Sequence, residues 1–475
     1  MAVASTAQTT RLQALEQALN RIGVTGAHRT ILAIIVAGAV FDSFEQNTIG
    51  IIGPVLRQSW GISATEIGLL NTVTFASGAI GRLLTGYLGD RYGRRTMLVL
   101  DLLLFTLGAV ICALAQNMSV LAAGRAVVGF GLGGEVSIAV TMLAEFCSAR
   151  FRGTAAGLVN VGAGGIGNFL APGFGLLIFA IFAGPDRWRY VFAALVLPAI
   201  LVVFYRRFVP ETPRFLLSRG DVAGANRVLS RLASGRLTAP EVKIEAFIPE
   251  SAQRDAAAPQ ASLTEIFRGP FARRTLPLSV AIWMTYGSQI SVLTLMPTIL
   301  VAQGYTITKS LLFTMVMQAG SLFGTSAASF FGYHLPRKPV LTYGAILACL
   351  AGLAFGFIHA NVALVLFFGM VFQFFVLMLN TTIFMYAPEL FPTRIRAFGT
   401  AFIMAVGPAS GSLMPLVSGR LFDAYGVGAV FALIAVMYVI FALCIQLMPE
   451  TFGRSLEDLN QPAGADDAVG ELVAA

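Results

Sequence analysis

Four charged side chains stand inside long apolar stretches of the chain, where burying a charge is costly. Asp42 and Glu45 lie three residues apart in one stretch, and Arg125 and Glu135 lie in another. A charge at the centre of a membrane-spanning helix costs about 2.5–3.5 kcal/mol on insertion scales, so ionisable residues kept there are candidates for function. Residues at i and i+3 share a helix face, which places the carboxyl groups of Asp42 and Glu45 side by side.

These four side chains could bind and release a proton. Two neighbouring carboxylates make each other's ionisation less favourable, whereas an arginine beside them makes it more favourable. A helical rise of about 1.5 Å per residue places Glu45 about 22 Å from one edge of a ~30 Å hydrocarbon core, and Arg125 about 9 Å from the other edge. We therefore expect a proton-coupling site formed by Asp42, Glu45, Arg125 and Glu135. The alternative is a static salt bridge that only holds two helices together.

A second group of side chains could bind a small molecule. An arginine binds a carboxylate through two parallel hydrogen bonds, whereas a lysine offers a point charge, so Arg125 could also hold a substrate acid. The second half of the chain offers hydrogen-bonding and aromatic side chains instead of buried charges. The candidates for substrate binding there are Trp283, Tyr286, Gln289, Asn380 and Tyr386. Taken singly, a polar residue in a membrane helix more often bonds to a neighbouring helix than to a ligand.

Membrane-spanning helices are the elements that must position these residues. The chain has 475 residues, of which 56% are hydrophobic and only 12% are charged, with a mean hydropathy of +0.78. An average soluble domain has roughly 25% charged residues. Stretches long enough to cross the hydrocarbon core lie near 30–53, 66–88, 97–115, 119–142, 155–183, 187–209, 275–303, 308–333, 339–360, 363–387, 397–421 and 425–448. We predict an all-α membrane protein of twelve transmembrane helices in two pseudo-symmetric six-helix halves.

The stretches and the loops between them divide the chain into five parts. We expect a cytoplasmic N-terminal tail at 1–29, a six-helix half at 30–209, a cytoplasmic central loop at 210–274, a second half at 275–448 and a cytoplasmic C-terminal tail at 449–475. Basic residues gather in alternate loops, and the positive-inside rule then places both termini in the cytoplasm.

The N-terminal tail contains an amphipathic pattern. Leu12, Leu15, Leu19 and Ile22 recur at helical spacing after Arg11. In a segment that precedes the first span, such spacing is typical of a short helix at the membrane interface.

Three motifs occur once in each half, in the same order. They are Glu145 with Arg152 and Glu389 with Arg396, Pro210-Glu211-Thr212 and Pro449-Glu450-Thr451, and the loop Gly86 to Arg95 with a weaker counterpart at Gly332 to Pro339. Two similar halves are the organisation of many secondary transporters, in which substrate binds between the repeats near the middle of the membrane.

The motifs resemble those of the major facilitator superfamily over nearly the whole chain, from about residue 30 to 458. The loop Gly-Tyr-Leu-Gly-Asp-Arg-Tyr-Gly-Arg-Arg at 86–95 is similar to its most specific motif, and the Pro-Glu-Thr segments resemble sugar-porter and metabolite-symporter signatures. Phe41-Asp42-Ser43-Phe44-Glu45 looks like the first span of the aromatic-acid:proton symporters. Two departures are the acid in Gly133-Gly134-Glu135 and the lack of an arginine in Val406-Gly407-Pro408-Ala409-Ser410. The resemblance implies a carrier that works by alternating access.

The resemblance also implies a charged gate at the cytoplasmic ends of the helices. Its candidate residues are Asp90, Arg94, Glu145, Arg152, Glu389 and Arg396. In the superfamily, such charges latch the two halves together when the carrier faces outward. A network formed in only one of two states need only bias a nearly balanced equilibrium. The alternative is that the arginines only fix the topology.

Together these patterns predict a proton-coupled symporter that imports a small organic acid, an aromatic or sugar-acid carboxylate, across the bacterial inner membrane. Alternatives are a sugar, polyol or organic-cation carrier and a transporter-like nutrient sensor. The sequence contains no nucleophile–base set or metal-binding cluster, so we expect neither an enzyme nor a bound metal or cofactor. The net charge of +8 is divided among loops, which argues against nucleic-acid binding. We expect a monomer whose partners are its substrate, protons and the lipid bilayer.

Overall fold

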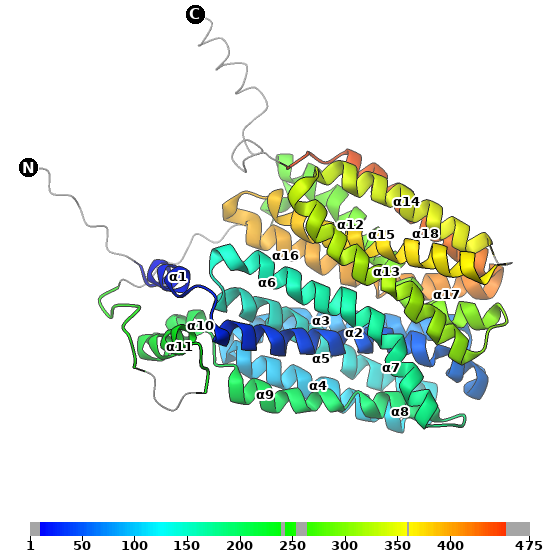
Figure 1. Cartoon of the computed structure of the whole chain (residues 1–475), viewed down its shortest axis with the longest axis horizontal. Coiled ribbons are helices and arrows are strands. Elements are labelled where there is room, and N and C mark those ends of the chain that lie inside the picture. Colours follow the sequence, from blue (N-terminus) through cyan, green and yellow to red (C-terminus); the bar gives the residue numbers. More distant parts are fainter. Residues whose placement is uncertain (1–9, 239–242, 253–263, 359–360, 453–475) are drawn as a thin grey trace, which may run out of the picture.

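The computed structural model describes residues 10–238, 243–252, 264–358 and 361–452 (Figure 1). Twelve spans in this part of the chain are long and apolar enough to cross a membrane, which confirms the predicted all-α fold. The first six are α2 (Gly26–Trp60), α3 (Ala64–Tyr92), α4 (Arg94–Leu114), α5 (Met118–Phe146), Phe151–Ile181 and Arg187–Phe208. The second six are α12 (Gly269–Ala302), α13 (Ile307–His334), α14 (Arg337–Phe357), α15 (Val362–Glu389), Phe398–Tyr425 and α18 (Val427–Gln446).

Three of the spans are irregular. The fifth consists of α6 (Ala149–Asn160), the π-helical turn η1 (Val161–Gly167) and α7 (Asn168–Ile181). The sixth consists of α8 (Arg187–Ala194), η2 (Leu197–Ala199) and α9 (Ile200–Phe208), and the eleventh of α16 (Thr393–Ser410) and α17 (Met414–Tyr425). Each change has a local cause, because η1 is rich in glycine and because Pro198 and Pro408 lack the backbone N–H that a continuous helix uses.

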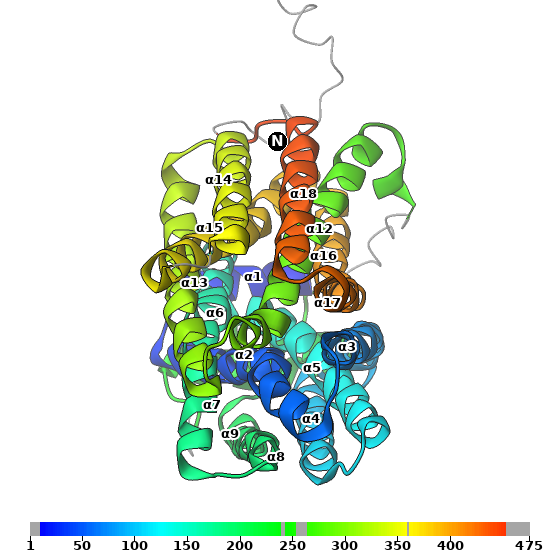
Figure 2. The same cartoon turned by 90° about the vertical axis from the view of Figure 1, so that its right-hand side faces the viewer.

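The spans form two halves, α2 to α9 and α12 to α18, which Figure 2 shows one below the other. Close contacts join α2 to α12, α3 to α17, and α7 and η1 to α13. Glycines make these contacts possible, since a Cβ at Gly50 would meet the carbonyl oxygen of Leu293 and one at Gly68 would meet that of Pro415. The Asp423 carboxylate of α17 also accepts hydrogen bonds from the first backbone N–H groups of α3, at 3.1 Å from Ala64 and 2.7 Å from Thr65.

These contacts gather at one end of the bundle, near the loops that follow Trp60 and Tyr425. Toward the other end, a Cβ added at Gly86 of α3, or at Gly153 or Gly157 of α6, would meet no atom within 4 Å. These close contacts between the halves thus lie toward one end of the bundle, and we call the other end, where the three glycines border open space, the open end. The open end carries α1 (Arg11–Ile22), α10 (Pro213–Ser218) and α11 (Val222–Ser234) (Figure 1).

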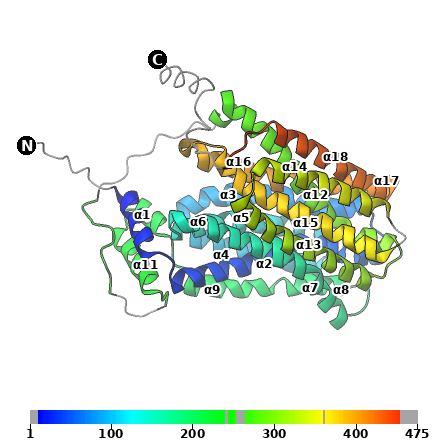
Figure 3. The same cartoon turned by 45° about the horizontal axis from the view of Figure 1, so that its top comes forward.

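The N-terminal helix forms over the predicted residues, Arg11–Ile22, and starts at a capping box between Thr10 and Gln13. The prediction that the apolar face of this helix lies on the membrane surface is wrong. Leu15 and Leu19 on that face are buried, and α1 contacts α10 and α11. Figure 3 also shows α1 beside α11 at the end of the bundle. The ion pair between Arg21 and Glu245, at 3.3 Å, joins the helix to the central segment. That segment, predicted as a loop over 210–274, contains α10, α11 and the short η3 (Glu265–Phe267) in its described part.

Candidate functional site

A fully buried ion pair joins α2 to α5 near the middle of the N-terminal half. Arg125 Nη1 contacts Glu45 Oε1, and both residues have no exposed surface. Arg125 Nε donates to Thr74 Oγ1 of α3 at 2.9 Å, so the guanidinium is held by two neighbouring helices. Thr74 reaches it because Gly129 lets α3 and α5 approach closely at the Thr74 backbone. Among the described residues, Glu45 Oε2 and Arg125 Nη2 have no hydrogen-bond partner.

Asp42 and Glu135, the other two predicted proton-coupling residues, belong to a second cluster beside this pair. Both are buried, with 6% and 2% of their surface exposed, and the two carboxylates interact electrostatically. Glu135 Oε1 and the Tyr205 hydroxyl of α9 both lie against Gly38, one helical turn before Asp42. The Tyr205 hydroxyl has no hydrogen-bond partner in the described part of the chain. The four predicted residues thus form two pairs along α2 and α5: Glu45 with Arg125, and Asp42 with Glu135, which lies about 15 Å along α5 from Arg125.

Asp101 of α4 is a buried acid that the sequence reasoning missed. It has no exposed surface, its Oδ1 accepts a hydrogen bond of 3.0 Å from Thr85, and its carboxyl group lies against Gly134. It interacts electrostatically with Glu135. Its place inside the apolar stretch 97–115 was the available signal. The N-terminal half therefore buries four acids and one arginine in this region.

The predicted substrate-binding residues of the C-terminal half are divided by the structure. Asn380 Nδ2 donates to Gln289 Oε1 at 2.5 Å, which joins α15 to α12. Trp283 and Tyr286 are half-buried on the same helix as Gln289. Tyr386 instead is fully buried and donates to the carbonyl oxygen of Pro449, at the open end of the bundle. Arg125, proposed for both roles, has its guanidinium engaged inside the N-terminal half.

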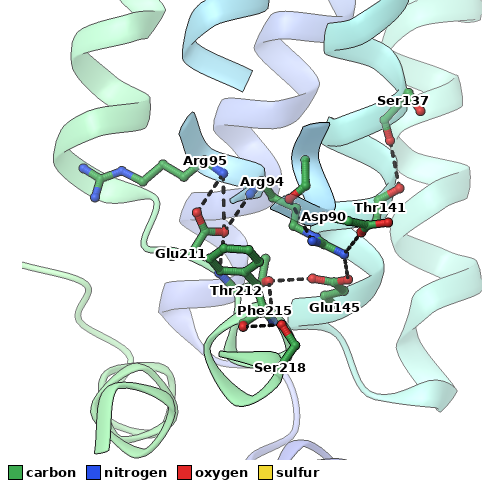
Figure 4. A network of polar contacts seen from close by, with 11 residues as sticks. Asp90, Arg94, Arg95, Ser137, Thr141, Glu145, Glu211, Thr212, Phe215 and Ser218 are labelled. Carbon is green, nitrogen blue, oxygen red and sulfur yellow. Dashed lines mark hydrogen bonds and ion pairs between the residues drawn. The ribbon is translucent and has the colours of Figure 1, made fainter. Parts of the chain in front are cut away.

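A polar cluster at the open end surrounds Arg94, the first residue of α4 (Figure 4). Its Nη2 contacts Asp90 at 2.6 Å and Glu145 at 3.2 Å, and its Nη1 donates to the carbonyl oxygen of Gly89 at 2.9 Å. Glu145 also accepts a 2.5 Å hydrogen bond from the Thr212 hydroxyl. The Arg94 guanidinium lies 5.6 Å from the centre of the Phe215 ring.

The C-terminal half contains the same arrangement around Arg337, the first residue of α14. Arg337 contacts Glu389 at 2.9 Å and donates to the carbonyl oxygen of Gly332. Glu389 accepts a 2.5 Å hydrogen bond from the Thr451 hydroxyl, and the Phe452 ring lies 5.7 Å from the guanidinium. Arg337 was not among the predicted residues, although the weak repeat at Gly332 to Pro339 pointed to it.

Two further predicted gate residues, Arg152 and Arg396, also occupy equivalent places. Arg152 Nε donates to the Cys147 carbonyl oxygen at 3.1 Å, and Arg396 Nε donates to that of Phe391 at 3.2 Å. Arg152 in addition lies 3.9 Å from Glu16 of α1. The ion pairs of Arg94 and Arg337 lie within their own halves, and that of Arg152 joins α6 to α1, so a latch between the halves stays a prediction. Residues 453–475 of the predicted tail lie outside the described part of the chain.

A glutamate caps the helix that begins each polar cluster. Glu211 accepts from the backbone N–H groups of Arg94 at 3.0 Å and of Arg95 at 3.2 Å, and Glu450 accepts from those of Arg337 at 3.0 Å and of Lys338 at 2.9 Å. A carboxylate at a helix N-terminus is favoured by the helix dipole.

The two caps differ in environment. Burial raises the pKa of Glu211 despite its hydrogen bonds to backbone N–H groups. Burial also acts to raise the pKa of Glu450, but four backbone N–H donors outweigh it, and this pKa is lowered.

Comparison with known proteins agrees with this geometry. The profile of the family described as "Sugar (and other) transporter" matches residues 10–462. The niacin transporter NiaP of Acinetobacter baylyi is 30% identical over 91% of this chain and 96% of its own, and a probable 4-methylmuconolactone transporter of Cupriavidus pinatubonensis is 27% identical over 90% and 91%. The structure of the xylose transporter XylE from E. coli in a partially occluded inward-open conformation superimposes with a TM-score of 0.73 at 20% identity, covering 90% of this chain and 99% of that one. With its two six-helix halves, this chain belongs to the sugar (and other) transporter family of the major facilitator superfamily, and it is a multi-pass membrane transporter of small-molecule metabolites.

Proposed function

We propose that the protein is a proton-coupled symporter that imports a small organic acid. The observation that carries this proposal is the fully buried Glu45–Arg125 ion pair, with the buried carboxyl groups of Asp42 and Glu135 further along the same two helices. Charges kept inside membrane helices are expensive and mark ion or substrate pathways. A static salt bridge would need one acid for one arginine, and this region contains three more acids than that.

The coupling step is a proton exchange at these carboxylates. When Glu45 takes up a proton, its ion pair with Arg125 is broken, and the guanidinium keeps its contacts with the Thr74 hydroxyl and the Phe192 ring but loses its counter-charge. A substrate anion between the halves is then electrostatically favoured, so proton and anion bind together more readily than either alone. After the halves have rocked to expose the other side, loss of the anion restores the ion pair and expels the proton.

The relatives support an organic acid as substrate. The niacin transporter is named for an aromatic acid, and the 4-methylmuconolactone transporter is named for a small ring compound. The half-buried rings of Trp283 and Tyr286 would suit such a ring. The neutral amide pair of Gln289 and Asn380 is the observation that favours the second candidate, a sugar or polyol.

The orientation is part of the same proposal. The alternate basic loops favour both termini in the cytoplasm, in the inner membrane of a bacterium. The open end of the bundle, which carries α1 and the central segment, would then face the cytoplasm. Cysteines introduced at residues 116–118 should be labelled from outside, and those at 235–238 only after permeabilisation.

Flux into proteoliposomes tests the function. Vesicles with an imposed pH gradient, acidic outside, should accumulate radiolabelled nicotinate or benzoate above the external concentration, and a protonophore should abolish the accumulation. Accumulation of xylose but of neither acid would replace this proposal by the second candidate. Binding without any flux would indicate a sensor.

A further inference from the structure

Helix α3 has three distinct faces near the open end of the bundle. Gly78, Gly81 and Thr85 pack against α5 and α4, since a Cβ at Gly81 would meet the backbone of Phe130 and Thr85 donates to Asp101. Exposed apolar residues form a second face toward lipid: Ile80 is 56%, Leu83 74% and Tyr87 66% exposed. The third face carries Phe75, Ala79, Arg82 and Gly86, which are all half-buried.

The third face of α3 is turned toward the C-terminal half. A Cβ at Gly411, in the eleventh span, would meet the Phe75 ring, and Arg82 stands two turns further along the same face of α3. Tyr286 of α12 lies within electrostatic range of the Arg82 guanidinium and packs against Gly407 of the same eleventh span. One turn beyond Arg82, the position of Gly86 borders open space. Arg82 therefore lies where the two halves begin to separate.

Arg82 and Arg125 differ in their ion pairing. Arg125 is fully buried and pairs with Glu45. In the described part of the chain, Arg82 forms no ion pair with any carboxylate. A guanidinium within a membrane-spanning helix is costly unless it is paired or reaches water or a ligand. The half-buried position of Arg82 between the halves leaves it placed to receive an anion from outside the chain.

We propose that Arg82 binds the carboxylate of the transported acid, with Tyr286 contacting its ring from the opposite half. This inference rests on the proposed function and assigns the anion contact to Arg82, while Arg125 remains the partner of the proton site. Arg82 can hold a carboxylate through two parallel hydrogen bonds. The bound acid would neutralise the arginine and touch both halves at once, which favours their approach around it.

Nicotinate and nicotinamide test this assignment, because they have the same ring and nearly the same shape but differ in charge. We would measure the affinity of the purified full-length protein for each by calorimetry. The wild type should bind nicotinate about ten-fold or more tightly than nicotinamide, a difference of about 1.4 kcal/mol or more. Arg82→Gln should lose this preference through weaker nicotinate binding, with nicotinamide affinity unchanged. Arg91→Gln, an exposed arginine at the end of the same helix, is the matched control and should keep the wild-type preference.

The outcomes separate the two proposals. A wild type without preference for nicotinate would refute the organic-acid function, whatever Arg82 does. A wild type with the preference and an Arg82→Gln variant that retains it would refute the role of Arg82 alone. If Arg82→Gln does not fold, Arg82→Lys serves instead, since it keeps the charge but not the paired hydrogen bonds. It should lose most of the preference, and full retention would again overturn the assignment.

Discussion

Arg94 and Arg337 make the same contacts in the two halves of the transporter. Each begins a helix, donates to the carbonyl oxygen of a glycine five residues before it, pairs with a glutamate from a neighbouring span and lies over a phenylalanine ring. Each half therefore contains a complete polar cluster built from its own residues. A change between conformations in which the halves move as rigid bodies leaves both clusters intact.

Loss of either arginine should lower stability. In Arg94→Gln, the Glu145 carboxylate, whose side chain is 7% exposed, loses its cationic partner. Removing one member of a partly buried pair should cost about 1–3 kcal/mol, because a charge is left unpaired. Arg337→Gln should destabilise the protein in the same way, because Glu389 then loses its cationic partner. Thermal unfolding in detergent measures this, with Arg91→Gln as the control, and unchanged melting in both variants would contradict the prediction.

The two capping glutamates should respond differently to pH. The pKa of Glu450 is lowered on folding, so its contribution to the free energy of unfolding is present above its ordinary pKa and is lost as pH falls through the folded pKa. The pKa of Glu211 is raised, so its contribution is present at low pH and is lost as pH rises through the folded pKa.

At pH 7, Glu450→Gln should therefore destabilise the protein more than Glu211→Gln. The difference between the two variants should shrink as pH falls toward 4. Melting curves of both variants between pH 4 and 8 check this. A larger loss of stability in Glu211→Gln than in Glu450→Gln at pH 7 would show that burial does not outweigh the backbone hydrogen bonds of Glu211.

Neutralising the acid of the buried ion pair should uncouple transport. Glu45→Gln cannot exchange a proton, so it should not accumulate nicotinate in a pH gradient, although exchange of internal for external substrate, which needs no net proton release, should remain. Asp42→Asn should act in the same way if the two acids share the proton. Accumulation at the wild-type level in both variants would move the coupling site to Glu135 or Asp101.

A methyl group at the packed end should shift the conformational equilibrium. In Gly50→Ala, the new Cβ would meet the Leu293 carbonyl oxygen of the other half, so the halves should separate there more often. Gly157→Ala is the matched control, because its Cβ would meet no atom within 4 Å. We would compare labelling of a cysteine introduced at Asn71, a buried residue of α3 whose Nδ2 donates to Thr294 Oγ1 of the other half at 2.5 Å. Labelling should rise in Gly50→Ala, and an equal rise in the control would rule out this cause.

Apolar length predicted the twelve spans, because covering a hydrocarbon core needs a fixed number of residues. The depth of each residue in the membrane, counted along its helix from the edge of the hydrocarbon core, also predicted that Arg125 can reach Glu45. The same reasoning could not show that Arg82 is turned to the other half while Leu83 faces outward, because this depends on the rotation of α3 about its axis. Asp101 was missed because a single acid near the start of an apolar stretch resembles the end of a loop. The interfacial role of α1 was wrong because its apolar face packs against α10 and α11, although the spacing of Val222, Ala225, Leu229 and Leu232 in the central segment is itself helical.

The self-contained polar clusters have a consequence for building the protein from fragments. Glu211 and Glu450 follow the last span of their own halves, and α1 is joined to the central segment at Ala252, whose carbonyl oxygen accepts from Arg11. A chain interrupted between Ala252 and Thr264 would leave the glutamate caps of α4 and α14 with the fragments that need them. Two polypeptides made separately in one cell should therefore assemble into a working carrier, and tags on the new ends would report each half independently.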